Sequence, residues 1–124
     1  MRRLVPLAAL ALLLGLTSLA ATADADPTAT AAAKCSLSGK ERKLGPTYTT
    51  SLTVTGVSCA TGEGVVKDYY TCRVRRGGKK GRCTTRVRGF SCTETRESIP
   101  TQFDAKVSCR KGSARVKHNY TQFT

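Results

Sequence analysis

Six cysteines constrain the fold of this chain more than any other feature of its 124 residues. They all follow residue 34: Cys35, Cys59, Cys72, Cys83, Cys92 and Cys109. An even number of cysteines in a short exported chain indicates a framework of disulfides. A zinc site is the alternative, but no two cysteines are spaced C-x2-C and His118 is the only histidine. We therefore expect three disulfides, no metal and no cofactor.

Residues 1–23 have the pattern of a secretory signal peptide. Arg2 and Arg3 precede an apolar segment, Leu4 to Leu19, and Ala21-Thr22-Ala23 offers an A-x-A cleavage site. The alternative is a retained membrane anchor, because the apolar segment is nearly as long as the roughly 20 residues that span a bilayer. Proline, glycine and hydroxyl side chains interrupt the segment, so cleavage is favoured. We expect an extracellular protein whose mature chain has no membrane span.

Residues 24–33 (DADPTATAAA) predict a disordered leader, and residues 34–124 a single small domain. A domain of this size buries a modest core and depends on its cross-links. Removing the signal peptide takes Lys+Arg from 21 to 19 against 8 Asp+Glu, a net charge of about +11. Such a charge favours association with polyanions.

The first half of the domain predicts two strands. Lys34–Ser38 is a short strand, Gly39–Pro46 a charged connection, and Thr47–Thr55 a strand rich in β-branched residues. One face of this second strand is expected to hold Tyr48, Thr50, Leu52 and Val54. Leu52 and Val54 should point into the core.

A helix is predicted from Cys59 to Cys72. Ser58 precedes it at the N-cap position, and Val65, Tyr69 and Cys72 recur at helical spacing. Two glycines each weaken this helix by about 0.8–1 kcal/mol relative to alanine. We expect it to depend on packing and cross-links.

The second half predicts a strand at Thr84–Thr95 and a loop at Arg96–Thr101. A bulge at Gly89 would let Val87, Phe90 and Cys92 all face the core. A hairpin is expected to follow, with Phe103–Cys109 and Ala114–Tyr120 joined by a turn at residues 110–113. The element order is β-β-α-β-β-β. The predicted class is therefore α+β, one helix packed on a four- to five-stranded antiparallel sheet.

Fifteen disulfide pairings are possible for six cysteines. A helix over residues 60–71 separates Cys59 from Cys72 too far for a bond, at about 1.5 Å per residue. A bond between Cys72 and Cys83 would close the basic segment between them. Cys59, at the start of the helix, could then reach Cys92 or Cys109. Of these two arrangements, we expect Cys59–Cys92 with Cys35–Cys109.

Three short motifs resemble a group of small secreted actinobacterial proteins of unknown function. They are V-S-C-A-T (57–61), G-F-S-C (89–92) and V-S-C-R-K-G (107–112). They match the pattern V-x-C-x-x-A, G-aromatic-x-C, V-x-C-x-x-G, with Gly62 in place of the helix alanine. The resemblance implies a fold and an exported location, and it carries over no catalytic residue.

The densest positive charge lies between residues 73 and 88. Its eight cations are Arg73, Arg75, Arg76, Lys79, Lys80, Arg82, Arg86 and Arg88. Arginine and lysine bind phosphate in a salt-dependent way, and glycines 77, 78 and 81 could also expose backbone N–H groups to an anion. The alternative is a solvated loop that keeps the protein soluble. The segment lacks aromatic residues for base stacking, so sequence-specific nucleic-acid recognition is disfavoured.

Three functions remain open. The first is a monomeric, non-enzymatic domain, without catalytic residues, that binds an anionic polymer, a lipid surface or nucleic acid non-specifically through these eight cations. The second is a protein-binding or inhibitor module that uses the sheet face or the Gly39–Pro46 loop. The third is a nuclease-like hydrolase in which His118 is the general base. We favour the first, because His118 alternates with apolar residues as a structural histidine does.

Overall fold

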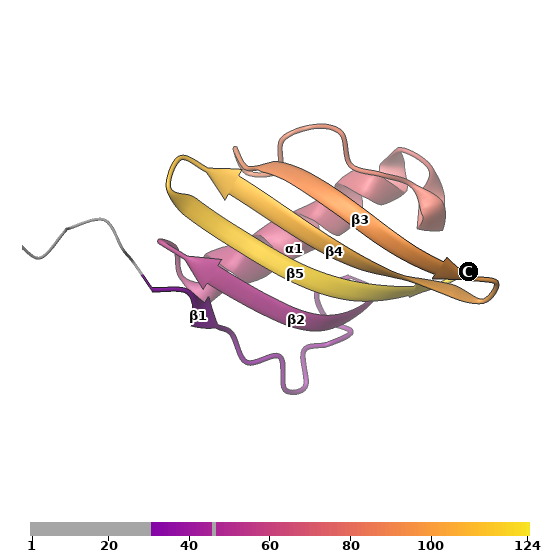
Figure 1. The fold of residues 1–124 in the computed structure, drawn as a ribbon, viewed down its shortest axis with the longest axis horizontal. Helices are drawn as coiled ribbons and strands as arrows, with labels where there is room; N and C mark the ends of the chain where they lie inside the picture. The colour runs from indigo at the N-terminus through magenta and orange to yellow at the C-terminus, as the bar shows by residue number, and fades with distance from the viewer. Residues whose placement is uncertain (1–30, 46) are drawn as a thin grey trace, which may run out of the picture.

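A computed structural model describes residues 31–45 and 47–124. The expected signal peptide and all but the last three residues of the expected leader lie outside them. One helix lies against one face of a five-stranded antiparallel sheet (Figure 1). The α+β class and the element order β-β-α-β-β-β are confirmed, and the strands lie side by side in the order β1-β2-β5-β4-β3. No helix in the described ranges is both long and apolar enough to cross a bilayer.

The sheet has one very short strand at its edge and four strands of 8 to 10 residues. The strands are β1 (Ala33–Lys34), β2 (Tyr48–Thr55), β3 (Ser91–Ile99), β4 (Gln102–Lys111) and β5 (Ala114–Phe123). The helices are α1 (Cys59–Arg75) and a single 3₁₀ turn, η1 (Gly78–Lys80). The first strand is shorter than predicted and begins inside the expected leader.

Strand β2 differs from its prediction at one point. A register shift between Thr49 and Ser51 changes which face the alternate residues occupy. Leu52 and Val54 are buried as predicted, but Tyr48 and Thr50 are exposed and Thr49 is buried instead. A single extra residue has this effect because side chains alternate with a period of two.

Helix α1 begins as predicted and ends later. The Thr61 N–H donates to the Ser58 hydroxyl at 3.1 Å, so Ser58 is the N-cap. The helix continues to Arg75, three residues beyond the predicted end. Cations in the last turn stabilise the extension, because the C-terminal end of a helix is partially negative.

The predicted strand at 84–95 is correct only from Ser91 onward, and the predicted loop at 96–101 is wrong except for its last two residues. Strand β3 starts at Ser91 and runs to Ile99, which pairs with Gln102 of β4. Pro100 lies in the two-residue turn between these strands, where it has no ladder hydrogen bond to lose. The ladder therefore continues up to the proline.

The segment before β3 is a turn and not a bulge. Arg88 and Gly89 have φ values of 50° and 80°, and the flanking Val87 and Phe90 exchange two backbone hydrogen bonds. Val87 and Phe90 are both buried, as predicted, and the partly buried Cys92 packs against the same hydrophobic core. The predicted hairpin of β4 and β5 is confirmed, with Gly112 at φ 57° in its turn.

The three disulfides are Cys72–Cys83, Cys35–Cys59 and Cys92–Cys109. The first was predicted. The predicted Cys59–Cys92 and Cys35–Cys109 are wrong, because both missed pairs arise from strand pairing. Cys35 directly follows β1, and its N–H donates to the Leu52 carbonyl of β2. This bond brings Cys35 beside Cys59 at the start of α1. Cys92 and Cys109 are direct partners in the β3–β4 ladder.

The helix glycines provide the first test. A Cβ on Gly62 would lie 2.6 Å from Val54 Cγ1 in the core, whereas on Gly64 it would meet only the guanidinium end of the long, half-exposed Arg88 side chain. Gly62→Ala should lower the free energy of unfolding despite the propensity gain of about 1 kcal/mol. Gly64→Ala should leave it unchanged or raise it. Urea unfolding of both variants measures the difference, and equal stabilities would contradict this packing.

Candidate polyanion-binding site

Arg73, the first of the eight predicted site residues, is not on the surface. Its side chain is 1% exposed. Its guanidinium donates to the Lys79 carbonyl at 2.7 Å and to Gln122 Oε1 at 2.8 Å, and lies 4.5 Å from the centre of the Tyr120 ring. Burial lowers the pKa of this guanidinium. Arg73 therefore joins the helix to the sheet and does not belong to a solvent-exposed binding surface.

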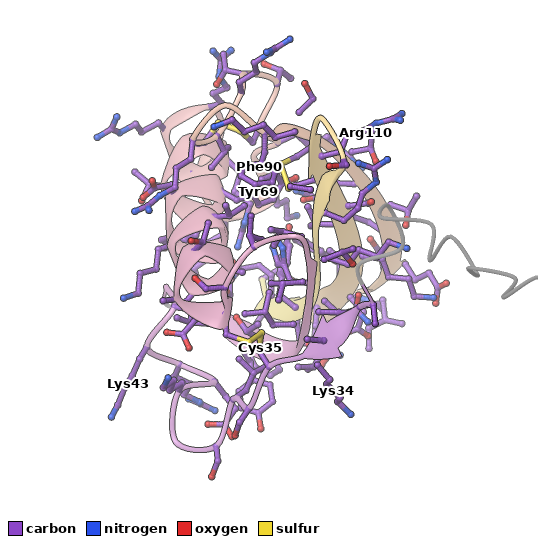
Figure 2. The ribbon with its side chains drawn as sticks, turned by 90° about the vertical axis from the view of Figure 1, so that its left-hand side faces the viewer. Lys34, Cys35, Lys43, Tyr69, Phe90 and Arg110 are labelled. Carbon is purple, nitrogen blue, oxygen red and sulfur yellow. A yellow bond between two sulfur atoms is a disulfide. The ribbon has the colours of Figure 1, made fainter. Side chains whose placement is uncertain are left out.

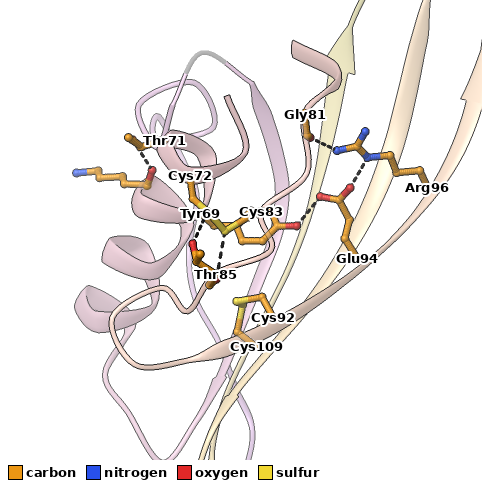
Figure 3. Close-up of a disulfide and its surroundings, with 11 residues drawn as sticks. Tyr69, Thr71, Cys72, Gly81, Cys83, Thr85, Cys92, Glu94, Arg96 and Cys109 are labelled. Carbon is orange, nitrogen blue, oxygen red and sulfur yellow. Dashed lines mark hydrogen bonds and ion pairs between the residues drawn. A yellow bond between two sulfur atoms is a disulfide. The ribbon is translucent and has the colours of Figure 1, made fainter. Parts of the chain in front are cut away.

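A buried carboxylate, Glu94 of β3, organises the core beside Arg73. It accepts hydrogen bonds from the Tyr69 hydroxyl of α1 at 2.6 Å and from the Tyr120 hydroxyl of β5 at 2.7 Å. Arg96 forms an ion pair with its other oxygen (Figure 3). Burial alone would raise the pKa of Glu94, but these hydrogen bonds and Arg96 outweigh it, and the pKa is lowered.

The predicted loop is folded back onto the end of α1. The Cys72–Cys83 disulfide closes it, and a Cβ on Gly81 would lie 1.9 Å from the Arg73 carbonyl oxygen. The N–H groups of Gly77 and Gly81 donate to Val74 and Gly78 within the loop. These two glycines therefore serve close packing, and their N–H groups do not form the anion cradle considered above.

Four of the predicted cations do converge, around a groove of about 620 Å³ that we call the arginine groove. Arg75 and Arg76 come from the end of α1, and Arg86 and Arg88 from the segment that follows the disulfide. The remaining lining residues are Asp68, Thr71, Cys72, Thr85 and Val87. The Thr85 hydroxyl lies 3.3 Å from Cys72 Sγ, which links the two walls (Figure 3).

The charges in the arginine groove are only partly compensated. Arg88 donates to Asp68 at 2.7 Å. In the described part of the chain, Arg75, Arg76 and Arg86 form no ion pair. Because the adjacent C-terminal end of α1 is partially negative, an anion must be held by the guanidinium groups and not by the helix dipole. Arginine is suited to this, since its planar fork binds phosphate and sulfate oxygens in pairs.

The other three predicted cations lie elsewhere. Lys80 and Arg82 line a separate depression of about 410 Å³ together with Arg96. Arg82 also pairs with Glu94 at 3.4 Å, so part of its charge is used inside the protein. Lys79 is exposed on η1. The eight predicted residues thus divide among a groove, a second depression, the surface of η1 and the core.

His118 lies inside the core. It is 2% exposed and packs edge-on against Tyr69, with ring centres 5.4 Å apart. Burial lowers its pKa to about 4, with the positive charge of Arg73 adding to the effect. Its Nδ1 has no hydrogen-bond partner among the described residues. The imidazole is therefore neutral near pH 7 and is not positioned at a surface where a substrate could reach it.

Sequence reasoning missed a second group of cations, on β4 and β5. Lys106 and Arg110 of β4, and Arg115 and Lys117 of β5, occupy the positions that alternate with buried residues. The signal was present in the sequence. Residues between the core positions of an amphipathic hairpin must face away from the core.

Comparisons of the chain with protein-family models, curated proteins and solved structures found no match. Within residues 31–45 and 47–124, no three histidine, cysteine or acidic side chains are grouped to hold a metal ion.

The Glu94 cluster predicts a large stability difference between two neighbouring glutamates. Glu94→Gln should lower the free energy of unfolding by roughly 3–5 kcal/mol, because it leaves the nearly buried Arg96 without its partner. The exposed Glu97 is the control, and Glu97→Gln should change it by less than about 0.5 kcal/mol. Denaturant unfolding at pH 7 measures both. Similar values for the two variants would contradict the proposed role of Glu94.

His118 predicts a pH dependence of stability. The unfolded chain binds a proton below pH 6.5, whereas the folded chain does so only near pH 4. The free energy of unfolding should therefore fall by about 2 kcal/mol between pH 7 and pH 5. His118→Gln should remove most of this slope, because the chain has no other histidine. An unchanged slope in the variant would show that another group is responsible.

Proposed function

We propose that the mature domain is a secreted, non-enzymatic protein that holds an anionic polymer in the arginine groove. The ligand class is a linear chain bearing phosphate or sulfate groups. The observation that carries the proposal is the convergence of Arg75, Arg76 and Arg86 on one groove without an ion-pair partner among the described residues. Their mutual repulsion is relieved when an anion binds between them.

The distribution of acidic residues supports this proposal. Glu63 pairs with Lys40 at 2.8 Å, Asp68 pairs with Arg88, and Glu94 is buried. Among the residues that the structure describes, Asp68 is the one carboxylate that lines the groove, and it is already paired with Arg88. The groove therefore keeps a net positive charge that an external anion can neutralise.

The disulfide next to the groove supports it further. The Cys72–Cys83 bond joins α1 to the segment that carries Arg86, so both walls are fixed before a ligand arrives. A site held in its bound geometry loses less conformational entropy on binding. The three disulfides also fit an oxidising compartment outside the cell.

Heparin chromatography tests the groove. Arg75→Gln/Arg86→Gln removes one guanidinium from each wall of the groove and should lower the salt concentration at which the protein elutes. It should also reduce the slope of log affinity against log salt concentration by about two. Arg42→Gln/Lys43→Gln is the control, since it removes the same charge from the loop after β1 and should elute close to the wild type. Equal elution of the two double variants would show that net charge, and not the groove, governs binding.

A further inference from the structure

The face of the sheet opposite α1 is strongly basic. Figure 2 shows Lys34 and Arg110 on the side of the sheet that points away from the helix. Alternate residues of β4 and β5 reach this face because the residues between them, such as Val107 and Val116, are buried against α1 or within the core. Its cations are Lys34, Lys106, Arg110, Arg115 and Lys117, and we call it the basic sheet face.

Strand register brings these cations together. Arg110 and Arg115 are direct partners across β4 and β5. Lys117 lies two residues from Arg115 on the same strand and face, and Lys106 is diagonal to Lys117, because its direct partner is Asn119. Lys34 extends the row across the sheet, since it pairs with Thr53, which pairs with Lys117.

This arrangement is unfavourable for the isolated fold. Like charges directly opposite each other on a sheet are destabilising, with cross-strand pair energies of about 0.2–1 kcal/mol. In the described ranges, none of the five cations forms an ion pair. The carboxylates found on this face in the described ranges, Asp104 and Glu97, are partners of each other at the start of β4, two residues from Lys106 and away from Arg110, Arg115 and Lys117. Asp104 also accepts a hydrogen bond from Thr121.

The floor between the cations consists of short polar side chains. Thr53 and Ser108 flank Lys117 on the two neighbouring strands, and Thr93 follows on β3. Hydroxyl groups can donate to phosphate or sulfate oxygens. The row lacks the aromatic anchors that dominate protein–protein binding energy. An extended anionic chain lying across the strands therefore fits this row of side chains better than an apolar protein partner, since the exposed Tyr48, Ile99 and Phe123 lie at the other end of the sheet.

We infer that the basic sheet face is a second polyanion-binding surface, so that one molecule joins two anionic polymer chains. The inference rests on the proposed function of the arginine groove. The groove is formed by α1 and residues 85–88 on the helix side of the sheet, whereas the second surface is the side that α1 leaves uncovered. Each surface has its own unpaired cations, so each can hold a separate chain.

A two-step capture experiment tests the inference. Full-length mature protein is bound to immobilised heparin at low salt and rinsed, and fluorescent heparin is then added. The wild type should bind the first heparin and capture the second. Lys106→Gln/Lys117→Gln should still bind the first layer through the groove, but capture at least about fivefold less fluorescent heparin per bound protein. Arg42→Gln/Lys43→Gln removes the same charge and should behave as the wild type.

The outcomes separate the two proposals. If wild-type protein binds the first heparin but captures no second chain, or if Lys106→Gln/Lys117→Gln captures as much as the control, the second surface is overturned and the groove stands. If Arg75→Gln/Arg86→Gln binds and captures as the control does, the groove is overturned, and with it the two-site arrangement. Circular dichroism of each variant shows that the comparison is between folded proteins.

Discussion

The contact between the Glu94 carboxylate and two tyrosine hydroxyls holds the helix to the sheet. Tyr69 comes from α1 and Tyr120 from β5, so one oxygen of a β3 side chain joins three elements. Burying a carboxylate is unfavourable unless it is paired and hydrogen-bonded, and Arg96 completes the set. Burial and the bond to Glu94 raise the pKa of both tyrosines, so their hydroxyls stay protonated and continue to donate.

This buried cluster also determines which charges reach the solvent. Arg73 is buried between the end of α1 and β5, so its charge does not reach the surface. Arg75, two residues later, lines the groove. The Glu94 carboxylate is buried in the core, whereas Asp68 forms an ion pair with Arg88 and Glu63 with Lys40. Much of the positive charge that remains therefore lies in the arginine groove and on the basic sheet face.

The sequence predicted structural features correctly where the interacting residues are close together in the chain. The Ser58 cap, the hairpin around Gly112 and the Cys72–Cys83 bond each involve residues close in sequence. The candidate site was predicted in part, because charge density identifies a basic segment but not the direction of each side chain. Interpreting residues 96–101 as a loop hid the β3–β4 ladder, and with it the pairing of Cys92 and Cys109.

The sequence alone determined the α+β class, the number of disulfides and the excess of positive charge, because these follow from periodicity, cysteine count and composition. The tertiary structure decided how the other four cysteines pair, which arginine is buried and where the cations meet. These features depend on strand order and register, which bring together residues far apart in the chain, such as Arg73 and Gln122. A one-residue shift, like that between Thr49 and Ser51, reverses the face that a side chain occupies, and propensity does not encode it.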